Sequence, residues 1–349
     1  MDGLRGVAIL WVMLHHANYF LGWGERLGPV LRRFFHVGFL GVDIFFVTSG
    51  FLITGLLIGD LGGHIRLRRF YLRRFFKIAP QYLLAVVTGF ILIAAAQENY
   101  GLKQKLSYFF FLQNYVDPIL LMHHLWSIAI EEHFYLFYPL VLASACFLFP
   151  RIEQRRTYLL MVFVCLIGLG NYARYLWFLN RPESDLLYAK IWQVTHIRFD
   201  ALIFGCLIKL LEPSLVSRTR SMKKIFASMC FFLAVGVFLW LIPRYQPLGW
   251  HCYTMAYVGA GLVLLSALTD FTPLKIFLEQ PILRSIGRDS YGIYLWHYLL
   301  LFPFKAVWLQ TGRNHAFILF YFLISVYAGA LTTRTVEKYF LNMRSRIVP

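Results

Sequence analysis

Charged residues are scarce in this sequence, and acidic ones are the scarcest. Only 15% of the 349 residues are Asp, Glu, Lys or Arg, whereas soluble domains have about 25%. Hydrophobic residues make up 59% of the chain, and the mean hydropathy is +0.61. So few charges exclude an ordinary soluble globular protein and indicate a chain with many membrane-spanning segments.

Cysteine is also sparse, and its spacing argues against two kinds of site. The five cysteines stand singly in apolar stretches, without the close pairs typical of zinc ligands or disulfide-rich domains. We therefore expect buried free thiols, no disulfide framework and no bound metal. The cysteines are Cys146, Cys165, Cys206, Cys230 and Cys252.

Ten apolar segments are long enough to cross a hydrocarbon core, which takes about 20 helical residues. A further apolar stretch, 106–121, is interrupted by Asn114, Asp117 and Pro118, so we expect an interfacial or half-membrane piece there. The sequence thus predicts an all-α polytopic membrane protein with about ten transmembrane helices that enclose a central polar cavity. No long polar insertion interrupts the pattern, so we expect one integral domain over 1–349 and no separate soluble domain. The ten segments are 4–22, 37–59, 77–96, 125–149, 157–179, 194–212, 225–242, 252–269, 290–309 and 315–336.

The basic residues outnumber the acidic ones, 34 to 17. Such an excess would also fit a nucleic-acid-binding protein, but here the basic residues occupy short loops between apolar segments. Loops on the side of the N-terminus carry roughly twice as many Lys and Arg as the loops on the opposite side. Arg174 is counted with the loops on the opposite side. The positive-inside rule therefore predicts a protein of the cytoplasmic (inner) membrane with both termini in the cytoplasm, in contact with lipid and not with nucleic acid.

Several ionisable residues interrupt the predicted spans at similar depth. A charge at the bilayer centre costs about 2.5 to 3.5 kcal/mol, so such residues usually face a protein interior or a water-filled cavity. At 1.5 Å per residue, His16 and Asp43 both lie roughly 9 Å below the outer surface and could meet. Arg198 and His297 add polar groups to the sixth and ninth spans. In the fourth span, steps of three and four place five polar residues on one helix face: His124, Ser127, Glu131, Tyr135 and Tyr138.

The polar residues of the predicted spans, and two glycines of the second span, also have purely structural interpretations. A single buried histidine, such as His133 or His297, can serve only as a hydrogen-bond partner between helices. Asp43 could be neutralised by protonation or by a neighbouring arginine. Gly55 and Gly59, one turn apart, are typical of close helix packing. The convergence of a histidine, an aspartate and a polar helix face at one depth is what favours a functional site.

A basic cluster follows the second span. Four Lys or Arg of the stretch RLRRFYLRRFFK, residues 66–77, recur at steps of three and four and can share one helix face at the membrane surface. Such a face suits an anionic cytosolic ligand, for example a phosphate-bearing cofactor. Ordinary membrane anchoring is the alternative, and it is the interpretation we favour for Arg66 and Arg68. The four are Arg69, Arg73, Arg74 and Lys77.

Together these motifs resemble those of the acyltransferase-3 family of integral membrane acyltransferases. The matching segments, in the family's order, are DGLRGVAILWVMLHH, GFLGVDIFFVTSGFLIT, FYLRRFFKIAP, HLWSIAIEEHFYLFYP and SIGRDSYGIYLWH. The resemblance implies a ten-span enzyme that takes an acyl group, usually acetyl, from cytosolic acyl-coenzyme A. It also implies an acceptor hydroxyl on a carbohydrate, a glycolipid or a macrolide-like molecule.

The resemblance assigns roles to individual positions. His16 matches the family's essential histidine, and Arg5 matches the arginine that precedes it. Arg74 and Lys77 match a paired-arginine motif, but Lys77 keeps only the charge and lacks the planar fork that binds phosphate bidentately. The predicted catalytic residues are His16, Asp43, Glu131 and Glu132. The predicted ligands of coenzyme A are Arg5, Arg69, Arg73, Arg74 and Lys77. The predicted acceptor-binding residues are Ser127, Tyr135, Arg198 and His297.

Two mechanisms and two other protein classes stay open. Acyl transfer to an alcohol needs a base, and we predict His16 in that role, oriented by Asp43 or by a glutamate of the fourth span. A covalent acyl-histidine is the rival mechanism. A secondary transporter or a proton-coupled membrane protein would also contain buried His, Asp and Glu, but the inverted repeat and broken helices typical of transporters are not evident in the sequence.

Overall fold

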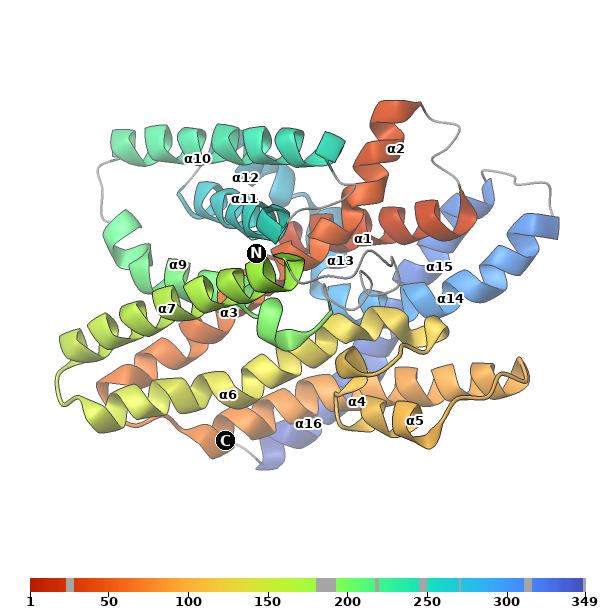
Figure 1. Cartoon of the computed structure of the whole chain (residues 1–349), viewed down its shortest axis with the longest axis horizontal. Coiled ribbons are helices and arrows are strands. Elements are labelled where there is room, and N and C mark those ends of the chain that lie inside the picture. Colours follow the sequence, from red (N-terminus) through yellow and green to blue (C-terminus); the bar gives the residue numbers. More distant parts are fainter. Residues whose placement is uncertain are drawn as a thin grey trace. The chain divides into compact units, whose positions relative to one another are not determined.

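The regular elements of this protein are helices. The computed structural model describes residues 1–22, 28–179, 193–216, 220–244, 250–269, 271–310 and 316–347, and within these ranges no strand occurs (Figure 1). This confirms the all-α prediction. The stretch 106–121, expected not to span, holds the end of α5 (Leu102–Phe109), the three-residue turn η4 (Gln113–Tyr115) and the start of η5 (Leu120–Leu125), without a long helix.

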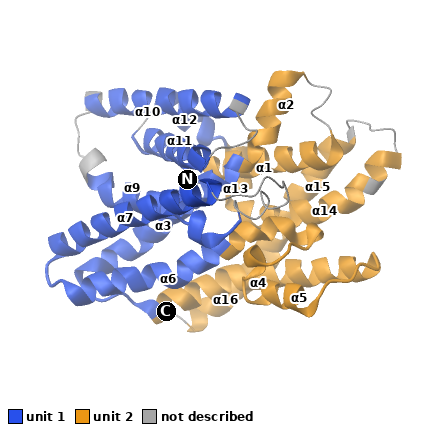
Figure 2. Ribbon diagram, viewed as in Figure 1, with its two compact units in different colours: residues 1, 40–67, 130–280 blue, residues 2–39, 68–129, 281–349 orange. Residues whose placement is uncertain are grey.

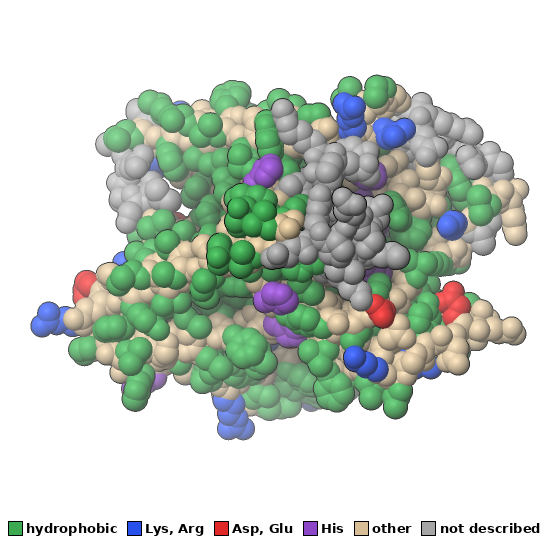
Figure 3. Space-filling model, in the orientation of Figure 1, with side chains coloured by type: hydrophobic (Ala, Val, Ile, Leu, Met, Phe, Trp, Pro, Cys, Tyr) green, Lys and Arg blue, Asp and Glu red, His purple; other side chains and the backbone are tan. Residues whose placement is uncertain are grey.

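Among the described residues, seven helical segments are long and apolar enough to cross a membrane. Large hydrophobic side chains lie exposed on them, such as Phe232 at 66% and Leu239 at 65%, and Figure 3 shows hydrophobic side chains over much of the visible surface. An apolar exterior of this kind fits a lipid environment, so the chain is an integral membrane protein. The segments are Pro29–Gly62, Leu67–Ala95, Ile152–Leu179, Met222–Leu241, Trp250–Leu268, Ser290–Gln310 and Phe317–Ile347.

Three further predicted spans are helical but fall outside these seven. They are α1 (Asp2–Leu21), α6 (Trp126–Leu148) and α9 (Asp200–Val216). The helix α9 has only 17 residues, while α1 and α6 carry ionisable side chains, including Arg5 and Glu131, that lower their mean hydropathy. The count of ten spans and the central polar cavity therefore stay predictions.

The chain divides into two compact units, each built from segments that are distant in sequence (Figure 2). Unit 1 comprises residue 1, Leu40–Leu67 and Ile130–Gln280, and unit 2 comprises Asp2–Phe39, Arg68–Ala129 and Pro281–Pro349. The further helices of unit 1 are α3 (Gly41–Leu57), η3 (Ile58–Gly62), α7 (Ile152–Leu179), η7 (Thr195–Ile197), α10 (Arg220–Leu241), η8 (Ile242–Arg244), α11 (Trp250–Leu268) and α12 (Thr272–Leu278). Those of unit 2 are α2 (Pro29–His36), η2 (Val37–Leu40), α4 (Leu67–Ala95), α13 (Pro281–Arg288), α14 (Ser290–Gln310), α15 (Ala316–Thr332), the π-helix η9 (Thr333–Glu337) and α16 (Lys338–Ile347). The prediction of a single domain stays a prediction.

In unit 1, α3 packs directly against the backbone of α9. A Cβ atom added at Gly50 would lie 1.9 Å from the carbonyl oxygen of Leu202, and one added at Gly205 would lie 2.1 Å from that of Val47. Only glycine fits at such distances, as in the small-residue contacts of other membrane helices. This contact holds Asp43, near the start of α3, close to the first turn of α9.

The glycines singled out from the sequence are not the ones that make this contact. Within the part of the chain that the structure describes, a Cβ atom added at Gly59 would have nothing within 4 Å, and one added at Gly55 would meet only the flexible side chain of Lys209, at 3.2 Å. Spacing alone favoured Gly55 and Gly59, since it cannot show which face of α3 meets α9. The packing interpretation was therefore wrong for Gly59.

The glycine contact predicts a matched pair of stability effects. Gly205→Ala should force α3 and α9 apart and destabilise the protein by about 1 to 3 kcal/mol, the usual cost of overpacking. Gly59→Ala, in open space, should change stability by less than about 0.5 kcal/mol. Unfolding of the detergent-solubilised protein, followed by circular dichroism, measures both. Equal unfolding midpoints for the two variants would contradict the contact.

In unit 2, α1 packs closely on α13 and also contacts α14. A Cβ atom at Gly6 would lie 2.3 Å from the carbonyl oxygen of Leu283, and one at Gly287 would lie 1.7 Å from that of Asp2. The start of α1 is thus held against α13, which is followed directly by α14. This arrangement sets the second half of α1 beside the middle of α14, where the candidate site lies.

Candidate functional site

The helices α1 and α14 of unit 2 bring two histidine rings together. Nδ1 of His16 lies 2.9 Å from Nε2 of His297, and the ring centroids are 5.1 Å apart. His297 is 0% exposed, whereas His16 is only partly buried. The sequence placed these residues in separate roles, as catalytic base and acceptor contact, but the structure joins them by a hydrogen bond.

A third histidine and a tyrosine complete this group. The ring of His124, from η5, lies 5.5 Å from that of His297 and stacks on Tyr298 at 4.6 Å. Tyr298 in turn meets the ring of His16 edge-on at 4.8 Å. We call His16, His124, His297 and Tyr298 the histidine cluster. The sequence interpretation placed His124 on a polar helix face but left it out of the site, and Tyr298 was missed because a tyrosine in an apolar helix is usually core or interfacial.

Ser127 lies beside the histidine cluster and bonds within the protein. Its Oγ is 2.7 Å from the hydroxyl of Tyr294, which itself donates to the carbonyl oxygen of His124 at 2.7 Å. These bonds join the start of α6 and η5 to α14. Ser127 was predicted to bind the acceptor, and in the structure its hydroxyl helps to hold His124 in place.

A basic cluster lies in the same unit, around one carboxylate. Nζ of Lys77 is 3.8 Å from Oε1 of Glu337, and Nε2 of Gln81 donates to Oε2 of Glu337 at 2.6 Å. Arg5 and Arg344 are near enough to interact electrostatically with Lys77. The helices α1, α4, η9 and α16 thus contribute to one group. We call Arg5, Arg74, Lys77, Arg344 and Glu337 the basic cluster.

The sequence interpretation missed two members of the basic cluster. Glu337 and Arg344 belong to TRTVEKYFLNMR, residues 333–344, for which no site residue was predicted. The sequence feature that could have indicated a site here is a single acidic residue, Glu337, within a basic segment. Glu337 also lies in a π-helix, and π-helical turns occur frequently at functional sites.

The remaining predicted ligands of coenzyme A lie on the first turns of α4. Arg73 is exposed, and Arg69 is half-buried, with no partner for its Nε among the described residues. The guanidinium of Arg74 lies 5.8 Å from the centre of the Phe70 ring. The four predicted ligands Arg69, Arg73, Arg74 and Lys77 therefore lie on one helix, as their spacing predicted. Lys77 differs from the others because Glu337 already balances part of its charge.

In unit 1, Asp43 pairs with Arg198. Nη2 of Arg198 is 3.0 Å from Oδ1 of Asp43, both side chains are buried, and the guanidinium lies 4.5 Å from the centre of the Tyr253 ring. A neighbouring arginine was one of the structural interpretations weighed for Asp43, and the structure supplies one. The expected pairing of Asp43 or a glutamate with His16 joins residues of different units and stays a prediction.

A second buried ion pair lies in unit 1. Nη1 of Arg174 donates to Oδ1 of Asp200 at 2.9 Å, and Nη2 bonds to the other oxygen. Arg174 also donates to Asn171 and Thr254. Counting Arg174 among outer-loop residues was wrong, because α7 extends to Leu179 and Arg174 is 0% exposed.

The polar face of α6 continues into unit 1. The hydroxyl of Tyr135 donates to Oε2 of Glu131, one turn earlier, at 2.5 Å, and lies 2.6 Å from Oγ of Ser49 on α3. Glu132 is half-buried at the next position. Nδ1 of His133 lies 2.7 Å from Oγ1 of Thr195, the kind of hydrogen bond between elements considered for this histidine.

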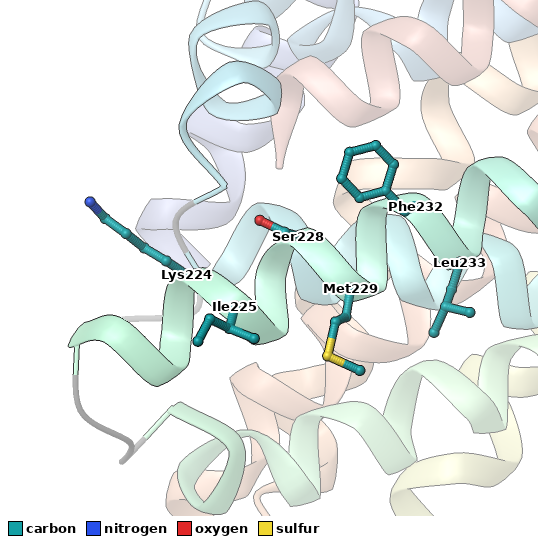
Figure 4. Close-up of a pocket in the computed structure, with 6 residues that line it drawn as sticks. All are labelled: Lys224, Ile225, Ser228, Met229, Phe232 and Leu233. Atoms are coloured by element: carbon teal, nitrogen blue, oxygen red, sulfur yellow. The ribbon is translucent and has the colours of Figure 1, made fainter.

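An apolar depression of about 620 Å³ lies on α10 (Figure 4). One helix supplies its whole lining, and none of the predicted site residues belongs to it. A feature of this kind fits the lipid-facing side of a membrane helix better than a reaction site. The lining residues are Lys224, Ile225, Ser228, Met229, Phe232 and Leu233.

Comparison with known proteins adds a family and relatives. The model of the acyltransferase-3 family, described as "Acyltransferase domain", matches residues 1–334. The "O-acetyltransferase OatA" of Staphylococcus aureus strain NCTC 8325 / PS 47 is 28% identical over 336 residues, which cover 89% of this chain and 51% of that protein. OatA of strain MRSA252 matches to the same extent. This chain therefore spans about half the length of these curated relatives. No solved structure gives a significant match.

Proposed function

Because the chain belongs to the acyltransferase-3 family, we propose that it is a membrane O-acyltransferase. It moves an acyl group, acetyl being the expected one, from acyl-coenzyme A to a hydroxyl of a carbohydrate-type acceptor. The similarity to OatA supports acetyl transfer to oxygen. The observation that carries the proposal is that one helix, α1, bears both Arg5 of the basic cluster and His16 of the histidine cluster.

The histidine cluster suits general base catalysis. His16 would take the proton from the acceptor hydroxyl as its oxygen attacks the thioester carbonyl. The carbon–oxygen bond forms, the carbon–sulfur bond breaks, and the proton passes from His16 to the departing coenzyme A thiolate. Histidine suits this exchange because its ordinary pKa of about 6.5 lets it accept and release a proton near neutral pH.

The basic cluster suits the phosphates of the donor. Arg5, Arg74 and Arg344 supply positive charge from three helices, and guanidinium groups bind phosphate through two parallel hydrogen bonds. Arg5 and His16 are eleven residues apart, so about 16 Å of α1 separates them. An extended coenzyme A held at Arg5 would direct its thioester toward His16.

This arrangement sets the orientation that we propose. Acyl-coenzyme A is a cytosolic molecule, so the basic cluster faces the cytoplasm and both termini lie on that side of the cytoplasmic membrane. The excess of Lys and Arg in the corresponding loops supports this orientation. As predicted from the sequence, we assign Asp43, Glu131 and Glu132 to the catalytic machinery and Ser127, Tyr135 and Arg198 to the acceptor side.

An assay of coenzyme A release tests the proposed function directly. The full chain in lipid nanodiscs should bind acetyl-coenzyme A and release free coenzyme A only when a carbohydrate acceptor is present, with acetyl found on the acceptor by mass spectrometry. A transporter or proton-coupled protein would be indifferent to acetyl-coenzyme A. Failure to bind it would therefore refute the proposal, as would acceptor-independent loss of the thioester.

The basic cluster predicts an effect on donor affinity. Arg74→Ala should raise the KM for acetyl-coenzyme A about 10- to 100-fold with little change in kcat, because a charged hydrogen bond to phosphate contributes about 1.5 to 3 kcal/mol. Arg66→Ala is the matched control, since Arg66 is exposed at 62% and pairs with Asp60 at 3.0 Å. Saturation curves for both variants measure the effect. A reduced kcat at unchanged KM for Arg74→Ala would contradict this role.

A further inference from the structure

The ring of His297 is anchored by its own helix. Nδ1 lies 2.8 Å from the carbonyl oxygen of Tyr294 and 3.2 Å from that of Ile293. A carbonyl oxygen can only accept a hydrogen bond, so Nδ1 of His297 carries a proton. Because both carbonyls belong to the preceding turn of α14, this anchor needs no other element.

The anchor decides what the other nitrogen can do. In a neutral imidazole with its proton on Nδ1, Nε2 is an acceptor. Nδ1 of His16 lies 2.9 Å from this Nε2, so it must donate. The opposite tautomer of His16 would set two lone pairs against each other at that distance.

We infer that His297 is a positioning residue that fixes the tautomer of His16 and leaves Nε2 of His16 as the basic nitrogen. This inference rests on the proposed function, in which His16 is the base. A histidine base commonly has its second nitrogen bonded to a carboxylate or to a backbone carbonyl. Here an uncharged imidazole takes that place. Its bond to His16 gains strength when His16 becomes protonated, since the donor is then charged.

Two other roles for His297 fit the geometry less well. Direct contact with the acceptor needs an accessible ring, but His297 is 0% exposed and is surrounded by the rings of His124, Tyr294 and Tyr298. Onward proton transfer needs an acceptor that can pass the proton on, and a backbone carbonyl oxygen cannot do so. The hydrogen bond from Tyr321 to the carbonyl oxygen of His297 further holds this turn of α14.

Two substitutions at position 297 separate positioning from packing. In His297→Gln the side-chain amide oxygen can accept the bond from Nδ1 of His16, whereas His297→Phe keeps a ring but accepts nothing. We expect His297→Phe to lower kcat about 100-fold or more at a KM for acetyl-coenzyme A within about twofold, and His297→Gln to recover most of the loss. His133→Phe is the matched control, because it removes a histidine hydrogen bond outside the histidine cluster, the one to Thr195. We expect it to change kcat by less than about threefold. Equal kcat values for His297→Phe and His297→Gln would overturn the inference.

A spectroscopic measurement tests the tautomer without relying on any variant at position 297. Nitrogen-15 chemical shifts of histidine-labelled protein, with the His16 signals identified by their loss in His16→Gln, should show the proton on Nδ1. A proton on Nε2 would overturn the inference whether or not the variants fold. The two failures are distinguishable. Full turnover in His16→Ala would refute the base while leaving the tautomer of His16 as measured in the unsubstituted protein. If His16→Ala is inactive but the unsubstituted protein has its His16 proton on Nε2, only the positioning role of His297 is refuted.

Discussion

Replacing His16 with alanine should abolish acyl transfer while leaving the binding of acetyl-coenzyme A nearly unchanged. A general base contributes about 10²- to 10⁴-fold to the rate, and that contribution is lost when the imidazole of His16 is removed. The donor site should survive because Arg5 and the other basic residues lie elsewhere on α1, α4 and α16. Turnover and equilibrium binding of acetyl-coenzyme A, measured on the same preparation, check both halves of this expectation.

The adjacent histidine provides the control. His15 lies next to His16 on α1, but its ring meets those of His36 and Phe39. His15→Ala should therefore retain turnover within about tenfold, since packing losses affect the rate less directly than loss of the base. Normal turnover in His16→Ala would remove His16 from the reaction. Trapping of labelled acetyl on His16 in the absence of acceptor would instead favour the acyl-histidine mechanism.

Replacing Asp200 with alanine should strongly destabilise unit 1. Arg174 is 0% exposed and Asp200 is equally inaccessible, so the substitution would leave a buried guanidinium without its counter-ion. Breaking such a pair costs about 3 to 5 kcal/mol. Chemical unfolding in detergent measures the loss, and low yield of folded protein is the corresponding outcome during expression.

Two comparisons define the effect of Asp200→Ala. Asp60→Ala removes the partner of exposed Arg66 and should cost less than about 1 kcal/mol. The double variant Arg174→Met/Asp200→Leu should be more stable than Asp200→Ala, because hydrophobic replacement of a buried pair is often neutral or stabilising. Equal stability of Asp200→Ala and Asp60→Ala would contradict a buried charge pair.

Local periodicity made part of the site predictable. The basic residues of α4 and the bonded pair Glu131 and Tyr135 follow from steps of three and four residues, which depend only on helix geometry. Composition likewise sufficed for the helical class and the membrane environment. The environment of a charge inside a predicted span was less accessible. Segment 157–179 contains Arg174 and ends where α7 ends, but Arg174 was counted with the outer loops because its partner, Asp200, lies on another helix.

The partners of the functional side chains were not predictable from local pattern. His16 and His297 are 281 residues apart in the chain, and Gln81 and Glu337 are 256 apart. Such pairs depend on which helix faces meet, and in unit 1 that is decided by backbone contacts at Gly50 and Gly205. A sequence pattern shows that a polar group needs a partner, but tertiary packing selects it.

The low hydropathy of α1 and α6 has a consequence for how the protein enters its membrane. A helix partitions alone into lipid only when its apolar residues outweigh the cost of its polar ones, and a central Arg or Asp costs about 2.5 to 3.5 kcal/mol. The helices that bear His16 and Glu131 would therefore rely on more apolar neighbours during biogenesis. Chains truncated before those neighbours are synthesised should leave these helices outside the bilayer. The helices that carry the proposed catalytic residues would then insert late in the assembly of the protein.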